Sequence, residues 1–355
     1  GTNFATNEGT INGRVFGGSG VDQLENFGVI HGDIELAGGP NNTLINAGTV
    51  DGSIGVITPM TGNDNLFNLG MIIGAISLDT GDDLYDGRSG TISGSINMGA
   101  GADRVLGGDG IEFVVGGDGR DTVDLGGGED TFFANAGADD GDDTIDGGLG
   151  SDTYDASSAT SAVIVDLDEG LASGASIGMD QLHNVENAIG SSAGDTLIGN
   201  ELANLLRGQD GADFLFGFSA SDTIEGNAGA DMLVGGLGRD FMSGGGLDGE
   251  MDLFDFNSIA ESGLVGATRD RILDFEDGVD KIDLSTIDAK SFQAGNQAFK
   301  FIGAAAFTSA GGQIRASVTA QGNTLIQLNI DKDKLAEMSI LVVGEPALTA
   351  ADFVL

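Results

Sequence analysis

The clearest pattern of apolar and polar positions in this chain repeats every nine residues between Gly190 and Ser243. Each unit carries an Asp or Asn at its sixth position and an apolar residue at its eighth. The units read GSSAGDTLI, GNELANLLR, GQDGADFLF, GFSASDTIE, GNAGADMLV and GGLGRDFMS. A short strand turns alternate side chains to opposite faces, so one apolar side chain per unit points inward. We predict that each unit is one short strand and one tight turn.

Such a repeat places its acidic side chains in columns. Two units make one coil with a turn on each edge, so residues 18 apart stack. One edge is predicted to hold Asp195, Asp213 and Asp231, and the other Asn204, Asp222 and Asp240. Stacked coils lie about 4.8 Å apart, where two bare carboxylates repel by roughly 3–4 kcal/mol at an effective dielectric constant near 20. We therefore expect cations between the coils. Ca²⁺ suits carboxylates and glycine carbonyls better than the stricter octahedral Mg²⁺.

A second block with the same period precedes the first. It reads GAGADRVL, GGDGIEFVV, GGDGRDTVD and LGGGEDTFF over residues 99–133. After four inserted residues it continues as ADDGDDTID and GGLGSDTYD over residues 138–155. Glu112 holds the sixth position of one unit, where its longer side chain makes a regular site harder to form. The predicted aspartate ligands of this block are Asp103, Asp121, Asp130, Asp143 and Asp152.

The first hundred residues have a longer period, near twenty. One phrase recurs as NEGTINGRVF (7–16), NFGVIHGDIEL (26–36), NAGTVDGSIGV (46–56), NLGMIIGAISL (68–78) and RSGTISGSINM (88–98). We interpret each coil as a hybrid, with a calcium turn on one edge and an uncharged glycine/asparagine turn on the other. Asn26, Asn46 and Asn68 are then expected to form a hydrogen-bonded ladder. The alternative is an uncharged β-helix whose aspartates are incidental. The turn positions between the phrases hold Asp22, Asn42, Asp64, Asp83 and Asp103.

Glycine is frequent in the predicted turns because it adopts positive φ angles at little cost. Glycine carbonyls are also expected to complete the calcium sites. The glycines predicted to supply them are Gly18, Gly20, Gly117, Gly119, Gly148, Gly150, Gly211, Gly229, Gly236 and Gly238.

Composition narrows the classes of partner. The chain carries 56 acidic and 14 basic residues, a balance that repels nucleic acid and anionic membranes and attracts cations. Having no cysteine, it forms no disulfide or thiolate metal site. No apolar run has the length of a membrane span. A glycine-rich acidic chain can also be disordered, but the regular apolar column argues against that alternative. Without an initial Met or a signal peptide, the chain is expected to be processed, trimmed or part of something longer.

The nine-residue unit resembles the calcium-binding repeat G-G-x-G-x-D-x-U-x of RTX (repeats-in-toxin) proteins. A second resemblance, to the C-terminal domain of serralysin-type secreted metalloproteases, covers about residues 156–355. It rests on VIVDLDEGLASG (163–174), DRILDFEDGVDKIDLS (270–285), QAFKFIGAAAFTSAGGQIR (297–315) and ALTAADFVL (347–355). The chain departs from that family at DKDKLAEM (331–338), which lacks the glycines of the family's acidic loop, so the resemblance gives little support for a calcium site there.

These resemblances imply an all-β chain, namely a parallel β-roll or β-helix solenoid followed by a β-sandwich cap. They also imply calcium at multiple sites and type I secretion from a Gram-negative cell to the extracellular space or cell surface. The implied secretion signal is Asp352, Phe353, Val354 and Leu355. The predicted domains are a solenoid of hybrid coils (1–98), a first roll block (99–155), a connecting segment (156–189), a second roll block (190–254) and a cap with the secretion signal (255–355).

No catalytic constellation is evident in the sequence. Zinc proteolysis of the serralysin type requires H-E-x-x-H, and neither His31 nor His183 is followed by Glu. Residues 174–178, GASIG, fit G-x-S-x-G, but no helical pattern follows them. We therefore predict a protein that is not an enzyme, with a polysaccharide-active site on the solenoid as the alternative. The only candidates for such a site before residue 100 are Arg14, His31, Tyr85 and Arg88.

Three functions remain open at this point. The first is a secreted structural protein of a surface layer, matrix or fibre, which folds on calcium and assembles through its solenoid ends. The second is the folding and secretion module of a larger extracellular hydrolase. The third is a glycan-binding adhesin, which two tyrosines and no tryptophan support poorly.

Overall fold

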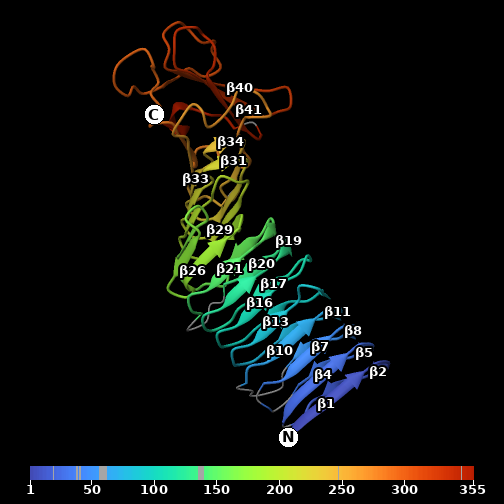
Figure 1. The fold of residues 1–355 in the computed structure, drawn as a ribbon. Helices are drawn as coiled ribbons and strands as arrows, with labels where there is room; N and C mark the ends of the chain where they lie inside the picture. Colours follow the sequence, from blue (N-terminus) through green and yellow to red (C-terminus); the bar gives the residue numbers. More distant parts are fainter. Residues whose placement is uncertain are drawn as a thin grey trace. The chain divides into compact units, whose positions relative to one another are not determined.

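A computed structural model describes residues 1–18, 20–36, 39, 41–55, 62–134, 140–246, 248–344 and 346–355. Parts of the predicted turns at residues 17–24, 38–45 and 60–67, and most of the insertion after residue 133, lie outside these ranges. The chain forms two compact units, one of residues Gly1–Val163 with Glu169–Asn187, the other of Ile164–Asp168 with Ala188–Leu355. Figure 1 shows the strands of each unit stacked coil upon coil in sequence order.

The first five coils of the first unit have three strands each, and these form three parallel sheets. The first sheet contains β1 (Thr2–Asn7), β4 (Val21–Asn26), β7 (Thr43–Asn46), β10 (Asn65–Asn68) and β13 (Leu84–Asp86). The second contains β2 (Thr10–Asn12), β5 (Val29–His31), β8 (Thr49–Asp51), β11 (Met71–Ile73) and β14 (Thr91–Ile92). The third contains β3 (Val15–Phe16), β6 (Ile34–Glu35), β9 (Ile54–Gly55), β12 (Ile76–Ser77) and β15 (Ile96–Asn97).

The third side of these coils differs from the predicted arrangement of two edges. Each recurring phrase contains two inward apolar positions, such as Ile30 and Ile34 in residues 26–36, both fully buried. Gly32, with a φ of 144°, turns the chain between them. A two-edged coil has no place for the second apolar residue, so the phrase forms two short strands instead of one.

Beyond the fifth coil, the first unit continues with the first and third sheets. Each coil there consists of two nine-residue units, so it contributes one strand to each of these two sheets. Leu24, Leu44, Leu66 and Tyr85 stack inside the first sheet, and Val105 continues the stack. The first sheet gains β16 (Arg104–Leu106), β18 (Thr122–Asp124), β21 (Thr144–Asp146) and β26 (Gly178–His183). The third gains β17 (Phe113–Val115), β20 (Thr131–Phe133) and β23 (Thr153–Asp155).

The second unit is a two-sided roll with the predicted apolar columns inside. Leu197, Leu215 and Leu233 pair in register on one side. That side contains β24 (Val163–Asp166), β28 (Thr196–Ile198), β30 (Phe214–Phe216), β33 (Met232–Val234), β36 (Leu253–Asp255), β38 (Lys281–Asp283) and β43 (Phe353–Val354). The other contains β29 (Leu205–Asp210), β32 (Thr223–Ala228), β35 (Phe241–Ser243), β37 (Arg271–Ile272) and β42 (Met338–Val342).

The C-terminal cap is built directly onto this roll. β42 pairs in parallel with β37, and β43 pairs in parallel with β38. β42 also begins an antiparallel sheet with β41 (Thr324–Asn329) and β40 (Gln313–Val318), and β39 (Lys300–Phe301) pairs with β40. In the part of the chain that the structure describes, no helix is long and apolar enough to cross a membrane.

Candidate calcium sites

The predicted aspartates form columns in which each carboxylate after the first accepts a hydrogen bond from the backbone of the coil before it. Asp121 Oδ1 accepts a hydrogen bond from the backbone N of Asp103 at 2.8 Å, and Asp143 Oδ1 accepts one from Asp121 at 2.8 Å. On the other edge of the first unit, Asp130 Oδ1 accepts from the N of Glu112 at 2.7 Å. Stacking at intervals of one coil is therefore confirmed for the first nine-residue block.

The second unit repeats this arrangement on both edges. Asp213 Oδ1 accepts from the N of Asp195 at 2.7 Å, and Asp231 Oδ1 accepts from Asp213 at 2.9 Å. On the opposite edge, Asp240 Oδ1 accepts from the N of Asp222 at 2.9 Å. Two columns run through this unit, as the period predicts.

The second oxygen of these carboxylates points into the turn. The Oδ2 atoms of Asp121 and Asp222 lie 2.5 Å from where a Cβ would stand on Gly116 and Gly217, the first glycines of the same units. Only glycine leaves room for the carboxylate in this position. Within the described residues, the following buried second oxygens have no hydrogen-bond partner: those of Asp103, Glu112, Asp121, Asp130, Asp143, Asp152, Asp213, Asp222, Asp231, Asp240 and Asp270.

The glycines predicted as carbonyl ligands lie in the same turns. The carbonyl of Gly211 points to the position that a Cβ on Gly229 would take, so the turns of successive coils approach closely. Gly18 acts differently, because its N donates to Asp22 Oδ2 at 2.8 Å. The predicted glycines with positive φ are Gly117, Gly119, Gly148, Gly150, Gly211, Gly229, Gly236 and Gly238. Gly20 also lies where two coils approach closely, since its carbonyl faces the position that a Cβ on Gly39 would take.

Burial makes the charged form of these carboxylates costly. Desolvation, with a further contribution from Asp121 and Asp83, raises the pKa of Asp103 to about 8. Desolvation, with a contribution from Asp240, raises the pKa of Asp222 to about 8, and it raises the pKa of Asp213 to about 7. A cation beside the carboxylates would offset both burial and mutual repulsion. Buried, anionic and oxygen-only turns of flexible geometry fit Ca²⁺.

At three column ends, protein donors satisfy the carboxylate. Asp143 donates its backbone N to Asp180 Oδ1 at 2.9 Å, and the other Asp180 oxygen accepts from the Tyr154 hydroxyl. Asp195 accepts from the N and Oγ of Ser191. Asp22 is similar, because its Oδ1 accepts from Asn3 Nδ2. The second oxygens of these three terminal carboxylates are not among the unpartnered ones.

The asparagine ladder predicted for the N-terminal coils is present. Nδ2 of Asn7 donates to Asn26 at 2.8 Å, Asn26 donates to Asn46 at 2.8 Å, and Asn46 donates to Asn68 at 2.9 Å. An amide both donates and accepts, so this column is satisfied without a cation. The acidic column follows the other turn, where Asp83 Oδ1 accepts from the N of Asp64. The described part of the first five coils thus has one acidic edge.

Five column residues were missed by the sequence analysis. Each lies two positions before an inward apolar residue, as in the repeat. The number of residues that separates it from the preceding acid of its column is irregular. Asp252 Oδ1, for example, accepts from Asp231 across 21 residues, and Asp270 Oδ1 accepts from Asp240 across 30. A search for Asp-x-apolar without a fixed period would have found most of them. The five are Asp180, Glu186, Asp252, Asp270 and Asp280.

The residues considered for sugar chemistry do not come together. Tyr85 is 1% exposed within the core. Arg14 pairs with Asp33 and Glu35, His31 with Asp51, and Arg88 with Asp86. Ser176 Oγ accepts from the N of Thr160.

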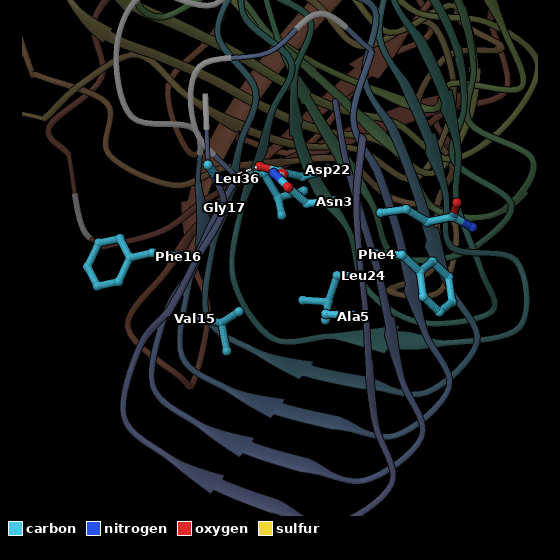
Figure 2. Close-up of a pocket in the computed structure, with 11 residues that line it drawn as sticks. Asn3, Phe4, Ala5, Val15, Phe16, Gly17, Asp22, Leu24 and Leu36 are labelled. Atoms are coloured by element: carbon cyan, nitrogen blue, oxygen red, sulfur yellow. Dashed lines mark hydrogen bonds between the residues drawn. The ribbon is translucent and has the colours of Figure 1, made fainter. Parts of the chain in front are cut away.

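A hollow of about 320 Å³ lies inside the first coil, at the end of the first unit. Figure 2 shows Ala5, Val15 and Leu24 bordering it, whereas Phe4 and Phe16 point away from it. Its lining is mostly apolar and contains a single acid of the columns, Asp22. The hollow is the open interior of the coil, distinct from the carboxylate columns.

The proposed secretion signal is part of the folded cap. Phe353 in β43 is 6% exposed and pairs with Ile282 in β38. Asp352 Oδ2 accepts from the N of Thr349 at 2.6 Å.

Comparison with known proteins matches most of the chain. A family model described as peptidase M10 serralysin C terminal matches residues 142–355, and the RTX calcium-binding nonapeptide repeat model matches residues 106–140. The metalloprotease AprA of Pseudomonas entomophila (strain L48) is 42% identical over 167 residues, which are 46% of this chain and 29% of that protein. The chain therefore aligns with less than a third of this relative.

Among solved structures, the AlgE6R3 subunit of the Azotobacter vinelandii mannuronan C5-epimerase is 29% identical, with 47% of this chain and 80% of that one covered and a TM-score of 0.26. The extracellular lipase LipA from Serratia marcescens is 16% identical, with 86% and 45% covered and a TM-score of 0.23.

Proposed function

Because the chain belongs to the peptidase M10 serralysin C-terminal family and carries RTX calcium-binding repeats, we propose that it is a structural component of an extracellular layer, matrix or fibre. In this proposal the chain leaves the cell unfolded by type I secretion and folds outside on calcium. Calcium binding at multiple sites and secretion are the general properties of such chains. The structural role is the specific part of the proposal.

The observation that carries it is the set of continuous columns of buried carboxylates with unpartnered second oxygens. Column residues after the first accept a backbone hydrogen bond from the coil before them, so the acids are part of the fold and not a surface addition. A solenoid held in this way presents long regular faces.

Calcium would supply positive charge between the coils, held by the column carboxylates and turn carbonyls. Without that charge, several carboxylate pairs at roughly 3–4 kcal/mol each would cancel a typical net stability of about 5–15 kcal/mol. A ligand that binds only the folded state at 100 times its Kd adds about 2.7 kcal/mol per site. The carboxylates therefore keep the chain unfolded where calcium is scarce and allow folding where it is abundant.

Burial of the C-terminal residues supports export before folding. Phe353 packs against Phe301, with ring centroids 5.2 Å apart, and belongs to β43 of the cap. If these residues form the export signal, the exporter can read them only while the chain is unfolded. The same calcium dependence would then keep the signal accessible to the exporter inside the cell and bury it in the folded cap outside.

A second function is favoured by the metalloprotease relative. The aligned 167 residues are 29% of AprA, and the matching family model describes a C-terminal domain. On this alternative the chain is the folding and secretion module of a larger extracellular hydrolase. Both functions share the calcium-dependent step and differ in whether the folded chain assembles.

Size-exclusion chromatography with light scattering, across a calcium titration from chelator to millimolar, separates the two. We expect an expanded monomer in chelator, which compacts as calcium rises and then forms large species. Compaction that stops at a monomer would instead favour the secretion-module function. A chain equally compact at all calcium concentrations would contradict the folding mechanism itself.

A further inference from the structure

Three of the nine arginines of this acidic chain lie on two consecutive coils of the second unit. Arg239 and Arg269 each directly precede a column acid, and the backbone N of the first of these acids donates to the second at 2.9 Å. Arg271 follows in β37 and pairs in register with Phe241 of β35. Burial, and after it the charge of Arg271, lowers the pKa of Arg269. The three positive charges therefore lie close to one another.

Two of these guanidinium groups share one aromatic ring and have no acid partner. Cζ of Arg239 lies 4.7 Å from the centroid of the Phe241 ring, and Cζ of Arg271 lies 5.7 Å from it. Among the described residues, neither forms an ion pair, and Arg239 Nε is buried without an acceptor. In the same sheet, by contrast, Arg207 pairs with Glu225 at 2.6 Å. Two like charges beside one ring would be stabilised by an anion.

The acids closest in sequence to these arginines are already engaged. Asp274, three residues after Arg271, accepts from Ser243 Oγ at 2.5 Å. Asp240 and Asp270 are buried in the column, where each accepts a backbone hydrogen bond. The anion would therefore come from outside this part of the chain.

An open pocket of about 420 Å³ lies beside Arg239. Two short strands that pair in parallel form one wall, β31 (Ser219–Ala220) and β34 (Leu237–Gly238). Ala267 and Thr268 form the other wall. Arg239 is the single charged residue among the described residues of the lining, which otherwise offers hydroxyl groups from Ser219, Ser221 and Thr268 and apolar surface from Ala220, Leu237 and Ala267.

The wall that carries Thr268 is held in place by hydrogen bonds within the protein. Arg269 Nε donates to Ser339 Oγ at 2.7 Å, and its terminal nitrogen donates to the Leu264 carbonyl. Ser262 Oγ donates to the Ser339 carbonyl at 2.7 Å. Arg269 thus fixes the pocket wall, while Arg239 and Arg271 keep their charges unpaired. A pocket formed in advance lowers the entropy cost of binding a ligand.

We propose that this pocket binds a small hydroxylated carboxylate, the chemistry of a sugar acid. The planar guanidinium of Arg239 would hold the carboxylate by two parallel hydrogen bonds, and Arg271 would add a second positive charge. The hydroxyl groups of Ser221 and Thr268 would meet those of the ligand, and Leu237 would cover its apolar side. Pockets of about 300–1,000 Å³ are usual for small ligands.

This inference goes beyond the proposed function and does not rest on it, because neither Arg239 nor Arg271 is a column residue. An acidic side chain of a second copy is the other source of a carboxylate. The experiment therefore has to distinguish a small solute from a second copy of the chain.

The test follows the arginine Nε–H signals of the full chain, labelled with ¹⁵N, by NMR in saturating calcium. The signals are assigned with Arg239→Gln and Arg271→Gln. D-galacturonate is the probe, and D-galactose, which differs only in lacking the carboxylate, is its matched control; the free calcium concentration is held constant. We expect saturable shifts of the Arg239 and Arg271 signals with galacturonate and none with galactose.

Substitutions test which arginine holds the ligand. Arg239→Gln should weaken galacturonate binding at least tenfold, as followed at Arg271. Arg120→Gln makes the same change of charge at an arginine that is already paired with Asp142, and it should leave binding unchanged. An unchanged calcium midpoint by circular dichroism shows that each variant folds.

Several outcomes would overturn the proposal. These are an unsubstituted chain whose Arg239 signal does not respond to galacturonate, one that responds equally to galactose, and binding unaffected by Arg239→Gln. Sulfate that binds more tightly than galacturonate would contradict the carboxylate ligand. Arginine signals that change on dilution of the protein, and not with galacturonate, would replace the small solute by a second copy. The calcium titration of the roll is a separate readout and does not depend on these results.

Discussion

At the scale of single residues, the column aspartates do two things with two oxygens. One oxygen accepts a backbone hydrogen bond from the preceding coil, and the other is buried without a partner in the described residues. The first stabilises the fold directly. The second imposes a cost that calcium would offset. A residue that both builds the coil and carries an uncompensated charge makes folding conditional on the cation.

Asp213→Ala should raise the calcium concentration needed for folding. The substitution removes one ligand and the acceptor of the Asp195 N, and one site at 100 times its Kd contributes about 2.7 kcal/mol. Asp210→Ala, an exposed acid in the same repeat, is the control and should leave the midpoint in place. Circular dichroism across a calcium titration measures both. An unchanged midpoint in Asp213→Ala would refute its assignment to the column.

At the scale of elements, the acidic and asparagine columns solve the same stacking problem in different ways. Buried asparagines donate and accept along their own column, so the N-terminal coils are satisfied on that turn by protein atoms alone. Buried aspartates cannot donate to one another while ionised. The N-terminal solenoid is therefore expected to need fewer cations per coil than the rolls that follow it.

Asn46→Ala should destabilise the N-terminal solenoid without changing the calcium response of the roll. It leaves the Asn26 amide donor and the Asn68 acceptor without their partner, and each unsatisfied buried group costs about 1–3 kcal/mol. Exposed Asn12→Ala is the matched control. Urea unfolding at saturating calcium gives the stability difference. A loss in Asn12→Ala as large as that in Asn46→Ala would argue against the ladder as the cause.

At the scale of the whole molecule, the raised carboxyl pKa values link folding to protons as well as to calcium. The pKa of Asp143 rises to about 8 through desolvation, followed by the charges of Asp121 and Asp180. An unfolded aspartate titrates near 3.9. Between these values the folded state binds more protons than the unfolded state, so stability falls as pH rises. Protons and calcium both relieve the same uncompensated charge.

In chelator, the chain should therefore be more compact and richer in β-structure at about pH 5 than at about pH 8, because the column pKa values lie between about 6 and 8. Light scattering and circular dichroism at both pH values test this. In saturating calcium the difference should shrink, since the cation then stabilises the ionised columns. Equal or greater compaction at the higher pH in chelator would contradict the linkage.

The sequence by itself determined the repeating part of this protein. A strict period of nine fixes which side chains face inward and which acids stack, because equal coils repeat the same contacts, as Leu197, Leu215 and Leu233 do. The asparagine ladder followed from the same reasoning. Calcium as the cation followed from stacked acid and glycine.

The tertiary structure alone decided what has no fixed period. Asp252, Asp270 and Asp280 join the columns although loops of unequal length separate them, because a strand enters the stack by pairing with the previous coil and not by its distance along the chain. The third side of the N-terminal coils likewise depended on where Gly32 turns the backbone.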